Sequence, residues 1–530
     1  MAATTANSQE SAPIITFGVE IECLTPWLFD DQEDPHGHIP NLPPPFRVKR
    51  EDLFGDTSIC ASDKVYRAVQ DTIDSLGLGS TLVKQDAEPT DPLGGYAYWE
   101  VEEDASVRPG DKLGYESTDV DGQANIHWVP LEIQSPVEIA SEERRGGANA
   151  FEILRYVIDV VTSTYRIRIN QTCSVHVHVG QARERLPLNM IQRLGALCFA
   201  ADPFLFTLHH PLRLVNHYCR PISEYSRLAI QAEVIPRHDE TFPSSGNRAY
   251  STECRDYQGA GLRHGEEPMS WRGLHRDRAT VEAFKRTRRP GHYEPYIFGL
   301  EWDNEPNVVV ERPALSDNDS IHRIIEQRVR SASTAITAAA ATTTYQPPRV
   351  RTLQRIATPR PRFTDEEVQE QRERLREETG SRIHSRDRKR GQVSVFEATR
   401  RIFGTISSCE VEALLSLENY QKPSINFSSY NCAELLTGDE LGTKRTIEFR
   451  LGSPSLDSEW VATWARICAG LVRFAIQAPV IRYIEVLSRC AQRTGYDIID
   501  LLEDLGLFPE AKVAERRLAQ NRVEWNLQFE

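Results

Sequence analysis

The sequence predicts an α+β fold in which helices back an antiparallel sheet. Three observations support this prediction. Short segments with alternating apolar residues recur along the chain, separated by clusters of Gly, Asp, Ser and Pro, as in antiparallel strands joined by loops. Between them lie segments with apolar residues every three or four positions, which are typical of helices. A long stretch rich in Arg, Asp, Pro and Thr, about 223–400, has little periodicity and predicts an insertion.

The order of elements follows from these patterns. We expect strands at 14–24, 96–103, 128–134 and 174–180 and strand-like sequence over 420–451. A loop is expected at 30–45, which is rich in Asp, Pro, Gly and His. Helices are expected at 65–76 with Gly77 as the stop, at 151–161, at 189–208, from about Ser458 behind an Asp457 or Ser458 cap, and over 482–530.

Five segments follow from this order. They are a disordered N-terminus (1–13), the first part of the main domain (14–222), a partly disordered insertion (223–415), the second part of the domain (416–481) and a C-terminal helical segment (482–530). Within the insertion, 331–344 is low in complexity and 364–378 is a charged stretch that can form a solvated helix. The basic run 385–390 is either a localisation signal or solvated surface.

Composition limits the partners. Lys plus Arg is 62 and Asp plus Glu is 77, so the formal charge of 62 − 77 = −15 opposes binding to nucleic acid or to an acidic membrane. The most apolar windows are short and interrupted by Asp202 and Arg473, so no transmembrane helix is expected. Ten cysteines without a Cys-x-x-Cys pair, in a chain without a secretory signal, predict reduced thiols and a location in the cytoplasm or nucleus.

Ionisable residues two apart recur in the predicted strands. In 14–24 the apolar side chains take the odd positions, leaving Glu20 and Glu22 together on the other face. Two ionised carboxylates spaced about 7 Å apart repel by about 2 kcal/mol at an effective dielectric near 20, and a divalent cation would remove that cost. His176 and His178 alternate with valines in the same way.

The last such segment is 446–451, where Glu448 and Arg450 stand opposite three apolar residues. Glu132 and Gln134 repeat the pattern more weakly. Each segment alone also fits an ordinary solvent-exposed strand face, a hydrogen-bonded histidine pair or a cross-strand ion pair. Taken together, they predict a sheet whose polar face is a concave site.

The types of side chain on this face predict the ligand of the site. Carboxylate oxygens suit Mg²⁺ or Mn²⁺, whereas zinc more often recruits thiolate or several imidazoles. The fork of Arg450 suits phosphate oxygens, so Mg-ATP is the expected ligand. The glycine-containing segments 438–444 and 259–261 lack the spacing of a phosphate loop or a dinucleotide turn, and there is no Gly-x-Ser-x-Gly elbow.

These residues resemble a known family. FGVEIE (17–22), CSVHVHVG (173–180) and TIEFRLGSPSLD (446–457) resemble, in order and spacing, the signatures of the putative amidoligase family. Segments 99–106, 131–136 and 213–221 are similar as well, so the resemblance covers roughly half of the chain. The family is placed with glutamine synthetase and glutamate-cysteine ligase in the carboxylate-amine ligase superfamily, which implies a glutamine-synthetase-like catalytic fold with a sheet lining an ATP and metal site.

The resemblance also implies roles for individual residues. Divalent metal would be held by Glu20, Glu22 and Glu132, and Glu448 would complete a second metal position. Phosphate would be bound by His178 and Arg450, and His176 would orient its neighbour or line the acceptor pocket. Asp104 would bind or deprotonate the amine, and Asn426 would lie near the nucleotide. The sequence departs from the family at Ser174 and Val175, where a Gly-Leu-like pair is common, and in the long insertion.

The implied activity is ATP-dependent ligation. The γ-phosphate would be transferred to a small-molecule or peptide carboxylate, and an amine would displace phosphate from the acyl phosphate to form an amide. Two other functions fit the same residues, a non-catalytic nucleotide- and metal-binding scaffold and a metal-dependent hydrolase. The identity of the carboxylate and amine and the number of chains in the assembly are left open by the sequence.

Overall fold

A nine-stranded sheet forms the centre of the described part of the chain. The computed structural model describes residues 14–51, 61–78, 80–81, 96, 98–104, 106–107, 126–142, 148–181, 185–230, 353–356, 393–417, 422–430, 445–492 and 495–522. The strands are β1 (Thr16–Phe29), β2 (Phe46–Val48), β3 (Ser80–Thr81), β4 (Trp99–Glu102), β5 (His127–Gln134), β6 (Glu138–Ile139), β7 (Val175–Gly180), β8 (Ile425–Asn426) and β9 (Thr446–Gly452).

The strand order is β3-β4-β5-β1-β7-β9-β8, with β2 and β6 also pairing with β1. All contacts from β4 to β8 along this path are antiparallel, whereas β3–β4 and β1–β2 are parallel. The predicted α+β class with a mainly antiparallel sheet is thereby confirmed. β1 continues five residues beyond the predicted end at 24, because β5 and β2 pair with it as far as Trp27 and Phe29 respectively.

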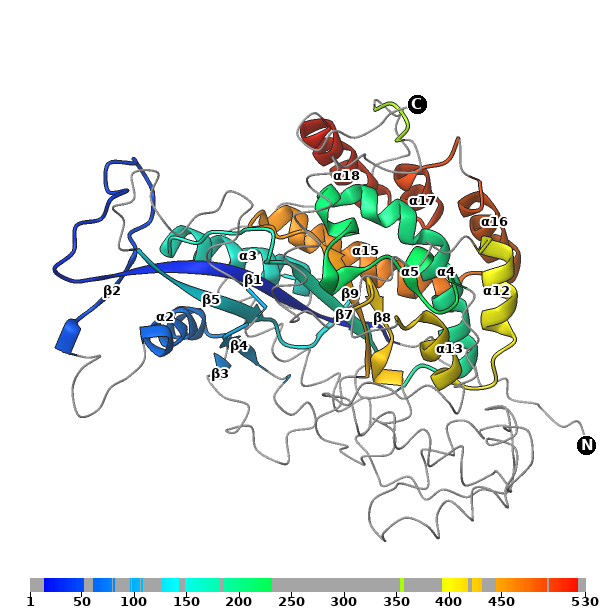
Figure 1. The fold of residues 1–530 in the computed structure, drawn as a ribbon, viewed down its shortest axis with the longest axis horizontal. Coiled ribbons are helices and arrows are strands. Elements are labelled where there is room, and N and C mark those ends of the chain that lie inside the picture. Colours follow the sequence, from blue (N-terminus) through cyan, green and yellow to red (C-terminus); the bar gives the residue numbers. More distant parts are fainter. Residues whose placement is uncertain are drawn as a thin grey trace, which may run out of the picture.

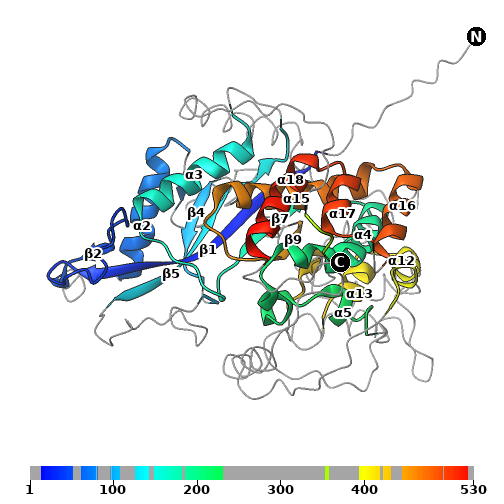
Figure 2. The same ribbon diagram turned by 90° about the horizontal axis from the view of Figure 1, so that it is seen from above.

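Helices surround this sheet. The α-helices are α2 (Ala61–Ser75), α3 (Ala150–Thr164), α4 (Leu188–Leu205), α5 (Ile222–Tyr225), α12 (Val395–Phe403), α13 (Ser408–Leu415), α15 (Ser458–Gln477), α16 (Val480–Cys490), α17 (Ile498–Asp504) and α18 (Phe508–Asn521). Short 3₁₀ turns are η3 (Phe206–Leu208), η4 (Pro211–Leu214), η5 (His217–Cys219) and η6 (Ser428–Tyr430). α2 and β2 lie at one end of the molecule and α12 and α16 at the other (Figures 1 and 2).

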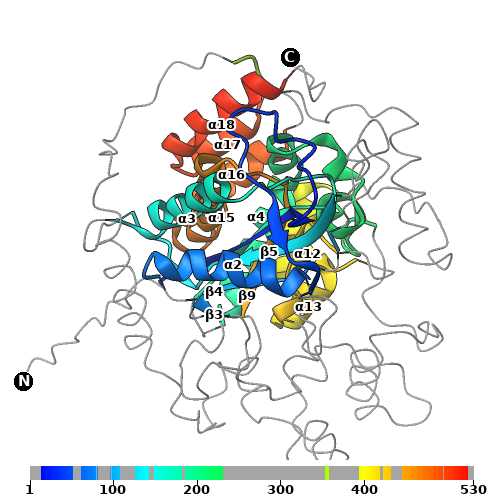
Figure 3. The same cartoon turned by 90° about the vertical axis from the view of Figure 1, so that its left-hand side faces the viewer.

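The apolar side of the sheet is covered by α3 and α15. These two helices lie side by side along β1 and β7 (Figures 1 and 3). Phe17 of β1 stacks on Phe151 of α3, with ring centroids 4.5 Å apart. The tryptophans at 460 and 464 are buried, and the Asp457 side chain accepts a hydrogen bond from the Trp460 backbone N–H at 3.2 Å. The predicted cap and core role of this helix are both confirmed.

Helix α4 is a core helix. Leu188–Leu208 is the one segment of the described residues that is long and apolar enough to cross a membrane, and 89% of its most apolar window is buried inside the protein. The predicted helix over 189–208 is correct for α4 but wrong for its last turn, which is 3₁₀ after Leu205. Pro203 inside α4 removes a backbone donor near that point, and the turn tightens there.

Among the described residues of the predicted insertion, α12 and α13 form helices. α12 and α13 pack against α4, and the Gln192 side-chain amide donates to the Thr405 carbonyl at 2.9 Å. The sequence shows little long-range periodicity here because both helices are short. The predicted features at 331–344, 364–378 and 385–390, like the N-terminal residues 1–13, lie outside the described residues.

Most of the remaining predictions of secondary structure and cysteine state are confirmed, and one is wrong. The loop at 30–45 and the stop at Gly77, which has φ +73°, are confirmed. The strand-like prediction for 420–451 is wrong at 428–430, which form η6. All seven described cysteines are free and buried, as expected of reduced thiols, and they are Cys23, Cys173, Cys198, Cys219, Cys409, Cys468 and Cys490.

Gly452 sets the distance between β9 and its neighbours. A Cβ at this position would collide with the Val175 carbonyl oxygen and lie 2.9 Å from Trp464 Nε1. We therefore expect Gly452→Ala to lower the free energy of unfolding by about 3 kcal/mol or more, since backbone must move. Urea unfolding measures this change.

Gly18→Ala in β1 is the matched control, because its Cβ would meet its nearest neighbours at 3.8–3.9 Å. This substitution should leave the unfolding midpoint close to that of the wild type. Equal midpoints for the two variants would contradict the close packing at Gly452.

Candidate active site

Strand pairing gathers the predicted site residues on one face. Glu20 lies opposite His176 on one side and Gln134 on the other, and His178 lies opposite Glu448. Because side chains alternate along each strand, these residues share the face that points away from α3 and α15. We call this the polar face, and its residues are Glu20, Glu22, Glu100, Glu102, Glu132, Gln134, His176, His178, Asn426, Glu448 and Arg450.

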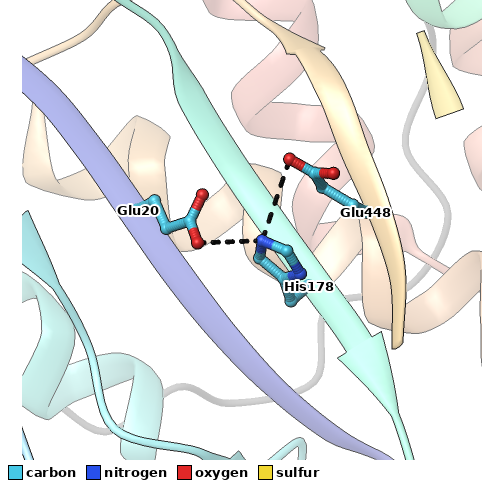
Figure 4. A group of neighbouring side chains, drawn as sticks. All are labelled: Glu20, His178 and Glu448. Atoms are coloured by element: carbon cyan, nitrogen blue, oxygen red, sulfur yellow. Dashed lines mark ion pairs between the residues drawn. The ribbon is translucent and has the colours of Figure 1, made fainter. Parts of the chain in front are cut away.

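Glu20, His178 and Glu448 converge from three adjacent strands (Figure 4). His178 Nε2 is 3.0 Å from Glu20 Oε1 and 3.9 Å from Glu448 Oε1. One ligand atom from each of the three residues lies within 4.8 Å of the other two. This spacing allows all three to bind one metal ion.

The hydrogen bonding of His178 suits a ligand role. Its Nδ1 pairs with Thr446 Oγ1 at 3.0 Å, whereas its buried Nε2 makes no hydrogen bond within the described structure. A metal-binding histidine is commonly arranged in this way, with one ring nitrogen held by the protein and the other directed at the ion. The chemistry of these donors therefore fits a divalent cation.

His176 lies at the centre of the carboxylates. Its Nδ1 is 3.3 Å from Glu20 Oε2, 3.4 Å from Glu22 Oε1 and 3.8 Å from Glu448 Oε1. Burial, together with the positive charge of Arg450, lowers the pKa of His176 to about 4. The imidazole is therefore neutral near pH 7 and can offer a lone pair to a cation.

Glu22 has a strongly raised pKa. Burial, reinforced by the negative charge of Asp104, raises its pKa from 4.5 to about 8. The hydrogen bond from Ser174 and the charges of Arg450 and Arg213 act in the opposite direction. Without a cation the group holds its proton at pH 7, and a bound cation would favour its ionised form.

Glu448 is held in place by two neighbours. Arg450 Nη1 donates to Glu448 Oε1, and Asn426 Nδ2 donates to Oε2 at 2.8 Å. Burial raises the pKa of Glu448, but the positive charges of Arg450 and the histidines outweigh burial and hold this pKa below its usual range. Arg450 also donates through Nε to the Tyr218 carbonyl at 3.0 Å, so its guanidinium is fixed from both sides.

Glu132 lies beyond Glu22 on the next strand. It faces Glu22 in the β1–β5 pairing and accepts a hydrogen bond from Gln134 Nε2 at 2.9 Å. The same amide donates to Glu102. Asp104, just after β4, is close enough to raise the pKa of Glu22. The structure therefore brings both Glu132 and Asp104 to the polar face, apart from the Glu20–His178–Glu448 group.

Several residues of this region, among them Glu100, were not among the predicted site residues. Glu102 lies on a strand with the same alternation, so the sequence carried a signal for it. Gln134 was recognised as a polar-face position but given no role. Ser174 and Arg213 lie outside the strands, and Arg213 is fully buried in η4, where its Nη2 donates to the Arg450 carbonyl at 2.6 Å. No periodic pattern marks a residue of a 3₁₀ turn.

Charge also favours a cation at this face. Six glutamates line it, and Arg450 and Arg213 offset part of that charge. The six are Glu20, Glu22, Glu100, Glu102, Glu132 and Glu448. Like charges held together in a poorly hydrated place repel strongly, and a divalent ion relieves this repulsion.

The geometry thus defines an α+β protein whose central sheet carries carboxylates and imidazoles on one face. Residues 13–242 match the family described as a putative amidoligase enzyme, and this match confirms the resemblance predicted from the sequence motifs. The corresponding searches found no matching curated protein and no matching solved structure. The matched residues include β1 and β7, whereas Glu448 and Arg450 lie beyond them and join the site through the β7–β9 pairing.

Without bound metal, the Glu22→Gln variant should become more stable relative to the wild type as the pH rises. Between pH 4.5 and about 8 the unfolded chain loses the Glu22 proton whereas the folded chain keeps it. The free energy of unfolding of the wild type should therefore fall relative to Glu22→Gln, by at most about 1.4 kcal/mol per pH unit, and the difference should be constant above that range.

Urea unfolding with a chelator present, at about pH 5, 6.5 and 8, measures this difference. A stability difference between the two proteins that does not change with pH would contradict the raised pKa of Glu22.

Proposed function

We propose that this protein is an ATP-dependent carboxylate-amine ligase that forms an amide through an acyl phosphate. One observation carries the proposal. Glu20, His178 and Glu448, which are far apart in the sequence, meet with ligand atoms within 4.8 Å of one another. The family match supports an amide-forming ligase in preference to other metal-dependent activities.

Mg²⁺ or Mn²⁺ would be held by Glu20, His178 and Glu448. Glu22 and Glu132, which face each other across β1 and β5, are placed to hold a second ion. Glutamate oxygens dominate both sets, and hard oxygen donors suit these cations. The bound cation would neutralise negative charge on the phosphate groups of ATP.

The chain's own residues would position the reactants. The substrate carboxylate oxygen attacks the γ-phosphorus while the bond to the ADP oxygen breaks, giving an acyl phosphate. Arg450 is fixed by Glu448 and the Tyr218 carbonyl, so its guanidinium is preorganised to stabilise charge on the transferred group. The amine then attacks the acyl carbon and phosphate leaves.

Two further residues fit this sequence of steps. Asp104 lies near Glu22 at the edge of the polar face and would accept the proton that the amine loses. Asn426 donates to Glu448, so its proposed place near the nucleotide is next to a metal ligand. The mainly antiparallel sheet with its polar face also supports a glutamine-synthetase-like fold for the catalytic domain.

ADP formation in the presence of Mg-ATP tests the proposed reaction. A screen of carboxylates and amines should yield ADP and phosphate when one member of each class is present. Glu448→Gln should reduce this rate by at least about a hundredfold. The variant loses one of the three proposed metal ligands, and Arg450 loses its ionic partner. The far-ultraviolet circular dichroism spectrum should be unchanged.

Glu397→Gln on α12 is the matched control, since that glutamate pairs with Arg400 on the surface and should leave the rate unchanged. Phosphate release without an amine would indicate a hydrolase. Tight ATP binding without any product would indicate a scaffold. Either outcome would overturn the ligase.

Mn²⁺ binding tests the metal group separately from catalysis. His178→Ala should weaken Mn²⁺ binding by about tenfold or more, because the variant loses the ligand nitrogen that lies between Glu20 and Glu448. Electron paramagnetic resonance measures this binding. His36→Ala in the 30–45 loop should bind as the wild type does. Equal affinity of wild type and His178→Ala would show that His178 is not a ligand.

A further inference from the structure

Arg213 is a buried arginine beside β9. It belongs to η4 and is 2% exposed. Its Nη2 donates to the Arg450 carbonyl at 2.6 Å, whereas its Nε makes no hydrogen bond within the described structure. A guanidinium stays ionised when it is buried, so its removal from water costs free energy. Packing alone does not account for a charged side chain at this position.

The contact between Arg213 and Arg450 is reciprocal. Arg450 Nε donates to the carbonyl of Tyr218, which lies in η5 shortly after Arg213. Each arginine side chain therefore holds the backbone of the segment that carries the other. The two hydrogen bonds close a ring between the turn 213–218 and β9.

The turn 213–218 is held by hydrogen bonds of its own. The Asn216 backbone N–H donates to the Arg213 carbonyl at 3.3 Å, and the Asn216 side chain accepts from the Tyr218 N–H at 2.8 Å. Just before η4, the His210 N–H donates to Ser453 Oγ at 2.7 Å, which joins this part of the chain to the end of β9. Arg213 thus grips β9 from a segment that is itself fixed.

This ring determines the direction of the Arg450 guanidinium. The Tyr218 carbonyl accepts from Nε and Glu448 accepts from Nη1, so Nη2 is the nitrogen left for a ligand. The Arg450 side chain is 16% exposed, far more than Arg213, and a guanidinium presents its N–H groups in a fixed plane. A small rotation at Arg450 would therefore turn Nη2 away from a bound anion.

We propose that Arg213 is a positioning residue that fixes the backbone of Arg450, so that the Arg450 guanidinium keeps the direction in which it stabilises the transferred phosphate. This inference rests on the proposed function only for the phosphate. Arg213 acts through Arg450 and does not itself contact the reactants. The competing role is a purely structural one, in which Arg213 stabilises the fold without affecting the orientation of Arg450.

Nitrogen-15 NMR of the full chain with labelled arginine distinguishes the two roles without an enzymatic assay. The Arg450 Nε signal is assigned by its loss in Arg450→Lys. In the wild type this N–H should exchange slowly with solvent, because it is bonded to the Tyr218 carbonyl. Arg213→Met should speed the exchange by about tenfold or more. Arg213→Lys, which keeps the charge and one donor group, should give an intermediate rate.

Arg193 on α4 provides the matched control. It too donates through Nη2 to a backbone carbonyl, that of Ala478, and its Nε is likewise buried without a hydrogen bond among the described residues. Arg193→Met should leave the exchange of Arg450 Nε–H unchanged, even where it lowers the unfolding midpoint as much as Arg213→Met does.

Kinetics of ADP formation test the same role in the proposed reaction. Arg213→Met should lower kcat by about tenfold and leave the KM for Mg-ATP within about twofold of the wild-type value, because Arg450 acts on charge that develops during transfer. In an Arg450→Lys background, Arg213→Met should lower kcat by less than about twofold, since its effect passes through Arg450.

Equal exchange rates of Arg450 Nε–H in the wild type and in both Arg213 variants would overturn the proposal. So would a loss of kcat on Arg213→Met that is as large in the Arg450→Lys background as in the wild type. Wild-type protein that forms no ADP would overturn the proposed ligase instead, and the exchange rates would still decide the role of Arg213.

Discussion

The repulsion between carboxylates on one face of a sheet is the constraint on which this structure depends. Glu20 and Glu22 are both buried, at 8% and 2% exposed, and further glutamates approach them from β4, β5 and β9. Such a face is costly in a protein without a function for it, because buried like charges oppose folding. Burial, reinforced by the negative charge of Asp104, raises the pKa of Glu22, and a divalent cation would favour its ionised form.

The rest of the fold makes that cost tolerable. α3 and α15 bury the apolar side of the same strands, so the stabilisation from one face offsets the electrostatic cost of the other. Arg450 and Asn426 hold Glu448, and Ser174 joins Glu22 to His176. These contacts fix Glu448, Glu22 and His176 in place, and the proposed ligase reaction would require such preorganisation.

The sequence predicted which residues share a face but not which residues meet. Alternation within each strand was enough to assign Glu20, His178 and Glu448 to polar positions. Their contact depends on the β1–β7 and β7–β9 pairing, which joins residues more than 150 positions apart and leaves no local signal. The shared pattern of the strands predicted one common site, and the family resemblance agreed with that prediction.

Other parts of the site lay beyond pattern reasoning. Arg213 belongs to a 3₁₀ turn, where no periodicity distinguishes a buried arginine from a surface one. The sequence predicted a phosphate contact for Arg450, and the structure adds that its guanidinium also fixes the carboxylate of Glu448. The resemblance implied that His178 meets phosphate, and the structure places its Nε2 between Glu20 and Glu448. The sequence does not specify the direction of a side chain, so this position could not be predicted from it.

Anomalous scattering from crystals soaked in Mn²⁺ would locate a bound metal ion. We expect a strong peak among the side chains of Glu20, His178 and Glu448, with the ion bonded to all three. Protein crystals that show no peak there, or that show these side chains turned away from one another, would contradict it.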